Sequence, residues 1–195
     1  MGCNTLITGG FLVNCNNLPV AGIDANIVLI NYDDINRATT TFNATNELLI
    51  ENFALKTGKT GYLLEGVKQS NGKNYSLVLG ENLPNRFKHG ISGKILNPSA
   101  ANKAQFQKIA NGKFVAVIKQ NWKGVDNKYA FEILVFEIGL ELVEATNNST
   151  EDSNTIVFSL TNVDGYEEAK MPFNLLKTDF NTTNTLFTNL FIQPQ

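Results

Sequence analysis

The sequence contains few of the residues that catalyse reactions or bind metals. It has one histidine, His89, and two cysteines, Cys3 and Cys15, in a chain of 195 residues. Two cysteines are too few for a disulfide scaffold, and neither has the additional Cys or His ligands of a zinc site. A Cys3–Cys15 disulfide is one alternative, but two free thiols better suit a protein that folds in a reducing cytosol.

No segment has the spacing of a catalytic motif. A nucleophile needs a base that a third group orients, and the chain contains no Gly-x-Ser-x-Gly or comparable setting. We expect His89, which lies among basic residues, to sit at a solvated hairpin tip. The carboxylates of "DGYEE" at residues 164–168 are too few for a calcium loop and predict a turn. The sequence therefore predicts a protein that is not an enzyme and has no catalytic residue, metal site or cofactor.

Charge is scarce as well. Only 17% of the residues are charged and the net charge is -2, whereas a general nucleic-acid binder would be strongly basic. No apolar run approaches the length of a membrane span, and the opening "MGCNTLITGG" lacks the regions of a secretory signal. The 27 asparagines predict a surface that is polar but weakly charged. Such a surface fits a chain that works within an assembly, and an AT-rich genome would produce the same bias.

Short strand-like runs dominate the rest of the chain. They lie at residues 26–32, 47–55, 61–69, 74–81, 89–96, 113–120 and 155–161. The run at 26–32 is almost continuously apolar, which is typical of a strand buried on both faces. Asn-Gly within residues 70–73 predicts a hairpin between the runs at 61–69 and 74–81.

The stretch "YAFEILVFEIGLELVEATNN" at residues 129–148 could form either a helix or a strand. Its apolar side chains alternate and then change parity: Tyr129, Phe131, Ile133 and Val135 are followed by Ile138, Leu140 and Leu142. A helix would scatter the four glutamates around its surface, so we predict a strand. The parity change indicates a bend at Gly139, either as a bulge in one long strand or as a corner between two strands.

One helix is predicted at about residues 98–111, with Asn97 as its cap and Pro98 in its first turn. A weaker candidate lies near 184–192. Together these patterns predict a mainly β fold, an antiparallel barrel or sandwich with one flanking α-helix. We expect a single domain over residues 1–195, with an N-terminal arm at about 1–20 and a C-terminal extension at about 174–195.

The polar segment at residues 33–45 is long for a hairpin loop and lies between two strong strands. One interpretation is that it contacts a neighbouring subunit, and the other is that it is a disordered surface loop. Under the first, the candidate interface residues are Asp33, Asp34, Arg37, Thr40 and Phe42.

Two parts of the chain resemble a known family. From Lys113 onward the order is a strand ending in Lys and Asn, a Tyr-led strand, a Gly-Leu pair, "ATNNSTEDSNTIVFSL" and "GYEEAKMPF". The opening "GCNTLITGGFLVNCNNLPVAGI" has an early Cys, a Gly, a second Cys and a Gly-Ile. These features are similar to those of bacteriophage tail tube proteins, particularly from phages of Bacteroidetes. The resemblance covers roughly two thirds of the chain, and residues 33–96 lie outside it.

The resemblance implies a tail-tube-like fold and a structural role in the virion, in a tail or a head-tail connector made in the host cytoplasm. It implies copies of the chain in a ring, usually hexameric, that contacts other tail or connector proteins and surrounds the genomic DNA without binding it specifically. We expect Asn, Thr, Ser, Asp and Glu to line such a channel, because a ring of Lys or Arg would trap DNA. No membrane contact is expected. The alternative is a non-enzymatic cell-surface or carbohydrate-binding β-sandwich module, which would require export.

Overall fold

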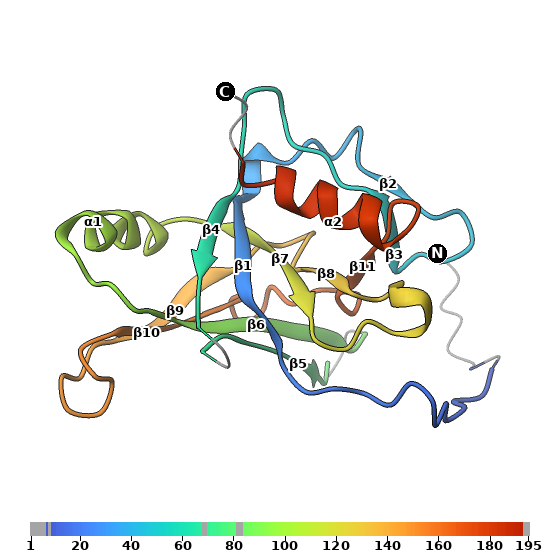
Figure 1. Cartoon of the computed structure of the whole chain (residues 1–195), viewed down its shortest axis with the longest axis horizontal. Helices are drawn as coiled ribbons and strands as arrows, with labels where there is room; N and C mark the ends of the chain where they lie inside the picture. Colours follow the sequence, from blue (N-terminus) through green and yellow to red (C-terminus); the bar gives the residue numbers. More distant parts are fainter. Residues whose placement is uncertain (1–6, 8, 68–69, 81–83, 193–195) are drawn as a thin grey trace.

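Two β-sheets lie face to face, and a helix covers the outer face of the larger sheet (Figure 1). The structure is a computed structural model that describes residues 7, 9–67, 70–80 and 84–192. The strands of the larger sheet are β1 (Ile23–Asn31), β2 (Thr41–Phe42), β3 (Leu49–Asn52), β4 (Tyr62–Glu65), β7 (Phe114–Gln120), β8 (Phe131–Leu134) and β11 (Phe173–Leu175). Those of the smaller sheet are β5 (Gly72–Val78), β6 (Arg86–Ile95), β9 (Glu141–Thr146) and β10 (Ile156–Thr161). The helices are α1 (Ala100–Ile109) and α2 (Phe180–Asn189), and 3-10 turns lie at Tyr32–Asp34 and Val125–Asn127.

The strand order makes the fold a sandwich. The seven-stranded sheet runs β2-β3-β11-β8-β7-β1-β4, and the four-stranded sheet runs β5-β6-β10-β9. Neighbouring strands pair antiparallel except β3 and β11, which are parallel. The mainly β prediction is confirmed, whereas a closed barrel and a single helix are wrong. The larger sheet ends in the open edges β2 and β4 instead of closing on itself.

Strand β1 shows why the central strands read as continuously apolar. Ile27 and Leu29 point into the core between the two sheets, while Val28 and Ile30 point into the core beneath α2. All four side chains are essentially inaccessible to solvent. The prediction of a strand buried on both faces is therefore confirmed for residues 27–30.

The stretch at residues 129–148 forms two strands that belong to different sheets. β8 lies in the larger sheet and β9 in the smaller one, and a reverse turn at Val135–Gly139 joins them. Gly139 N–H donates to the Val135 carbonyl at 3.0 Å, and φ is positive at both residues, 54° at Val135 and 93° at Gly139. The arrangement is thus the corner between two strands, and neither a helix nor one bulged strand.

The corner also explains the change in parity. Phe131 and Ile133 face the core beneath α2, whereas Val135, Leu140 and the half-buried Leu142 belong to the core between the sheets. A chain that moves from one layer to the next changes the side on which its apolar residues must lie.

The predicted Asn-Gly hairpin is wrong. β4 pairs with β1 in the larger sheet, and β5 pairs with β6 in the smaller one. The side-chain amide of Asn71 and the N–H of Gly66 both donate to the carbonyl of Ala25, which precedes the paired part of β1. These bonds hold β4 on β1, so Asn71 and Gly72 carry the chain across to the other sheet instead of reversing it.

The helices differ from the prediction in number and in their caps. α1 begins after Ser99, whose side chain accepts the N–H of Asn102 at 3.3 Å, so the proposed cap at Asn97 is two residues too early. The weaker helix candidate at 184–192 is real, but α2 begins at Phe180, after the cap Asp179. α2 packs through Phe187 and Leu190 onto the larger sheet.

The two ends of the chain behave differently. Residues 9–22, which we call the arm, run outside both sheets (Figure 1). The region predicted as a C-terminal extension contains most of β11, which lies between β3 and β8, and α2, which covers the core. This region is therefore an integral part of the sandwich.

Candidate functional site

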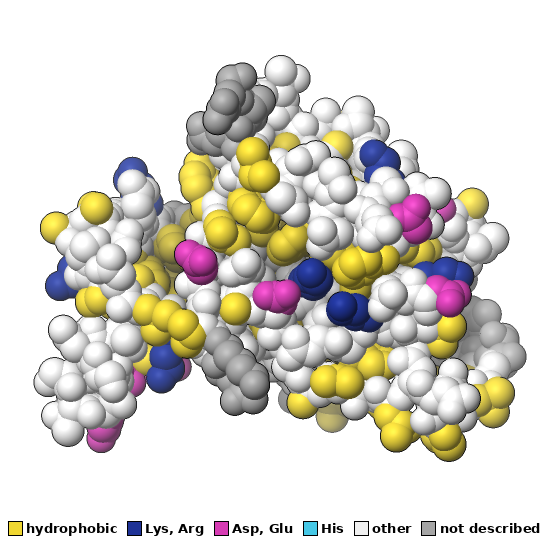
Figure 2. Space-filling model, in the orientation of Figure 1, with side chains coloured by type: hydrophobic (Ala, Val, Ile, Leu, Met, Phe, Trp, Pro, Cys, Tyr) yellow, Lys and Arg dark blue, Asp and Glu magenta, His cyan; other side chains and the backbone are white. Residues whose placement is uncertain are grey.

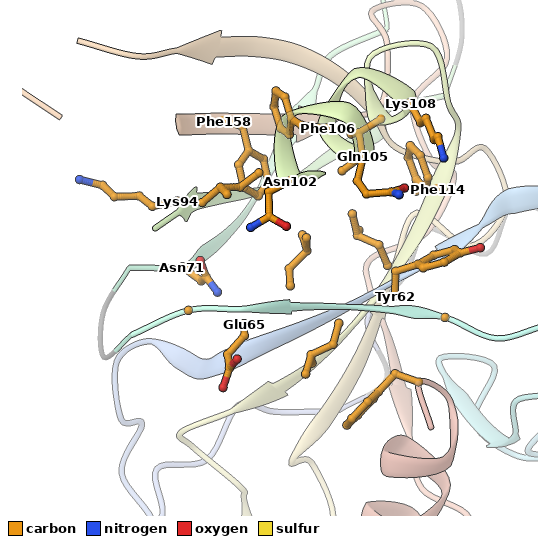
Figure 3. A pocket seen from close by; sticks show the side chains of 18 of the residues that line it. Tyr62, Glu65, Asn71, Lys94, Asn102, Gln105, Phe106, Lys108, Phe114 and Phe158 are labelled. Atoms are coloured by element: carbon orange, nitrogen blue, oxygen red, sulfur yellow. The ribbon is translucent and has the colours of Figure 1, made fainter. Parts of the chain in front are cut away.

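A cleft lies between β4 and α1 (Figure 3). It has a volume of about 1040 Å³ and lies where the larger sheet ends and the sandwich stays open. β4 forms one wall, and α1 with the end of β6 forms the opposite wall. The cleft exists because β4 is short and α1 stands off the sheet without one fully buried residue.

The floor of the cleft is apolar. Leu29, Phe114 and Phe158 line it and are buried, and the half-buried Phe106 and Ile109 of α1 face them. The rim is polar and carries few charges: its labelled polar side chains are Tyr62, Glu65, Asn71, Lys94, Asn102, Gln105 and Lys108 (Figure 3). An apolar floor with a mixed rim suits a segment that buries hydrophobic side chains.

The outer edge of β4 offers backbone hydrogen bonds to the cleft. Gly66 N–H donates to Ala25 at 3.0 Å, so in the alternating antiparallel pattern Leu64 also bonds to β1. The backbone groups of Leu63 and Glu65 consequently point away from β1. No partner for them lies within the described residues. Such an edge can accept an additional strand.

The far end of this edge is closed. Gly61 N–H donates to the carbonyl of Leu190 at 2.6 Å, and Thr60 Oγ1 donates to the same oxygen at 3.1 Å. These bonds join the end of α2 to the start of β4. The free edge is therefore limited to β4 itself, next to the cleft.

His89 is not at a solvated tip, contrary to the prediction. It lies within β6, its side chain is 2% exposed, and burial lowers its pKa to about 4, with an interaction at the Lys170 backbone opposing part of the drop. Neither ring nitrogen has a partner of good hydrogen-bond geometry among the described residues. The edge of the ring contacts Tyr75 at 6.3 Å between centroids. A neutral, buried imidazole here packs like an apolar ring.

Glu168 is the buried member of the "DGYEE" turn. Its Oε1 accepts the N–H groups of Glu137 and Ile138, both at 2.9 Å, and so holds the corner between β8 and β9. Burial raises the pKa of Glu168, although these two bonds oppose the shift. No set of three or more potential metal ligands occurs in the described ranges. The carboxylate is positioned to order the corner.

The segment at residues 33–45 is folded against its own chain. Asp34 is buried, accepts the Asn31 amide at 2.8 Å and pairs with Lys59 at 3.0 Å. Burial opposes ionisation of Asp34, but these two contacts hold its pKa below the usual range. Asp33 is exposed.

The other candidate interface residues also make internal contacts. Arg37 donates to the carbonyl of Phe136 at 2.9 Å and lies over the ring of Tyr32 at 4.1 Å. Thr40 is buried, whereas Phe42 is 40% exposed and packs edge-on against Phe136. Of the five candidates, Asp33 and Phe42 are thus exposed and available for contact, and the interface stays a prediction.

Cys15 lies in the arm and is exposed. Cys3 lies outside the described residues, and so does any bridge between the two. The cleft could not be predicted from the sequence, because its walls come from segments that pair with distant strands. Its signal in the sequence is the apolar run around Leu63 and Leu64, a pattern that predicts a hairpin strand.

The comparisons with known proteins bring no relative. No family model, no curated protein and no solved structure matches this chain. In the part of the chain that the structure describes, neither helix is long and apolar enough to cross a membrane.

Proposed function

We propose that this chain is a structural protein of a bacteriophage tail or head-tail connector that forms rings around the DNA conduit. The observation that carries the proposal is the arm, which presents large apolar side chains to solvent. Those more than half exposed are Phe11, Leu12, Val13, Leu18 and Val20. A soluble monomer gains nothing from such a surface, whereas an assembly buries it.

Other features support the same role. The larger sheet has an open edge at β4, and edge strands commonly pair across subunits. The smaller sheet adds exposed Tyr75 and Leu77 on its edge strand β5. The resemblance to tail tube proteins, carried by the opening residues and the segment from Lys113 onward, gives the assembly its proposed place in a virion.

The proposal is tested by imaging the purified full-length protein by negative-stain electron microscopy. We expect closed rings with a central opening, alone or stacked. Mass spectrometry of the purified phage particle is expected to find the chain in the tail or connector fraction. A monodisperse monomer that binds oligosaccharides on a glycan array would contradict the proposal and favour a carbohydrate-binding module.

A further inference from the structure

The arm is uncharged as well as exposed. No Asp, Glu, Lys or Arg precedes Asp24 in the sequence, so the whole arm is free of charge. Phe11 and Leu12 are 94% and 95% exposed, and the hydrogen bonds within residues 9–20 are local, such as Asn17 N–H to Asn14 O at 3.0 Å. Figure 2 shows hydrophobic side chains gathered along this part of the surface. Burial of an apolar, uncharged segment against another surface is favourable, because it removes apolar side chains from water.

The cleft beside β4 has the complementary properties. Its floor is apolar, its rim carries few charges, and the outward backbone groups of Leu63 and Glu65 are available for strand pairing. An extended segment placed there would bond through its backbone and bury alternate side chains on the floor. Residues 9–20 would span roughly 40 Å when extended, at ~3.3 Å per residue, which exceeds the length of β4.

The arm and the cleft face opposite ends of the molecule. The arm leaves β1 and runs away from α1, and the two lie at opposite ends of the longest axis in Figure 1. A donor at one end and an acceptor at the other produce a head-to-tail contact between copies. Such heterologous contacts close into rings or continue as filaments.

We propose that the arm of one copy enters the cleft of the next copy and pairs with β4 as an additional strand. The inference rests on the proposed ring function for the closure of the assembly, and it adds the contact that joins neighbouring subunits. Phe11, Leu12 and Val13 are the donor residues, because they are the most exposed apolar residues of the arm. Leu63, Glu65 and the facing side of α1 form the acceptor.

The test uses full-length variants, each defective on one side only. The donor variant carries Phe11→Asn, Leu12→Asn and Val13→Asn. The acceptor variant carries Leu63→Pro, which removes an outward N–H and keeps the bonds between β4 and β1. Gln105→Asp, on the exposed surface of α1 at the cleft, is a second acceptor variant that does not alter any strand. The control is Val143→Asn, which changes an exposed apolar side chain on β9 that does not line the cleft.

Self-association is measured by sedimentation velocity, with circular dichroism as the check of folding. We expect the donor variant and both acceptor variants to associate at least tenfold more weakly than the unmodified protein, and the control to associate normally. A mixture of donor and acceptor variants retains one intact arm and one intact cleft, so it is expected to form 1:1 dimers and nothing larger. Because the arm is uncharged, the association should change little between low and high salt.

Two results would overturn the inference, and a third would separate it from the ring function. Normal rings from the donor variant would do so and would leave the ring function standing. A second such result is a donor variant that is monomeric by itself and a mixture of donor and acceptor variants that gives no 1:1 dimer. It would show that the arm occupies its own cleft or another surface. If the mixture gives 1:1 dimers while the unmodified protein forms open chains only, the strand exchange holds and the ring function fails.

Discussion

Gly139 adopts a backbone conformation that other residues avoid, at the corner where the chain passes between sheets. Its φ is 93°, and an added Cβ would collide with Cγ of Lys113 and lie 2.9 Å from Cδ2 of Tyr32. We predict that Gly139→Ala lowers the free energy of unfolding by about 2–4 kcal/mol, since it combines a positive φ with crowding. Urea unfolding monitored by fluorescence measures the loss.

Gly165→Ala is the matched control. Gly165 has a φ of 86°, but nothing lies within 4 Å of its added Cβ. We expect it to lose only about 1 kcal/mol, from the backbone conformation alone. Equal losses in the two variants would contradict the crowding at Gly139.

His89 makes stability depend on pH. Its pKa in the folded protein is about 4, below the usual 6.5. Between these pH values the imidazole is protonated in the unfolded chain and neutral in the folded chain. Stability should therefore fall as pH drops from 6.5 toward 4, by up to ~3 kcal/mol. His89→Phe keeps an aromatic ring against Tyr75 and removes this proton. We predict that the free energy of unfolding of this variant, measured with urea between pH 4 and 7, falls less as the pH decreases.

Glu168 acts in the opposite direction. Its pKa is raised by burial, so its stabilising contribution is present below the usual carboxylate pKa of 4.5 and is lost as pH rises through its folded value. Comparing His89→Phe with the unmodified protein isolates the histidine, because both retain Glu168. If both proteins show the same slope over pH 4–7, His89 does not bind protons in the way that its burial indicates.

At the scale of elements, the N-cap of α1 is Ser99, whereas the sequence predicts Asn97. Ser99 accepts the Asn102 N–H, whereas the side chain of Asn97 caps nothing and its backbone carbonyl accepts the Asn102 amide at 2.7 Å. We predict that Ser99→Ala costs ~1 kcal/mol of helix stability and Asn97→Ala much less. Amide hydrogen exchange within α1 measures both. Faster exchange in Asn97→Ala than in Ser99→Ala would restore Asn97 as the cap.

The elements that local patterns determine could be predicted, and those that depend on distant pairing could not. The apolar runs at β1 and β7 and the alternation at β10 follow from burial of residues close in sequence. The hairpin prediction failed because bonds from Asn71 and Gly66 to Ala25, far away in sequence, assign β4 and β5 to different sheets. The burial of His89 and the open cleft depend on the same non-local pairing.

At the scale of the whole molecule, the proposed ring places a requirement on the side chains that line its channel. A ring repeats each inward side chain in every copy, so one lysine becomes a continuous positive band that retains DNA through counterion release. We expect the lining to consist mainly of Asn, Thr, Ser, Asp and Glu, with Lys and Arg turned outward or paired, as Lys73 is with Glu132. Electron cryomicroscopy of the ring gives the potential along its axis. A continuous positive lining, or tight salt-sensitive binding of DNA, would contradict a passive conduit.

Native mass spectrometry of the full-length protein shows whether copies join head to tail into closed rings. In the proposed assembly, the uncharged arm of one copy pairs with the open edge at β4 of the next copy. We predict closed assemblies of one copy number, six or a multiple of it, that dissociate to monomers when Phe11, Leu12 and Val13 are replaced by asparagine. A monomer at every concentration, or a continuous series of dimers, trimers and longer chains, would contradict it.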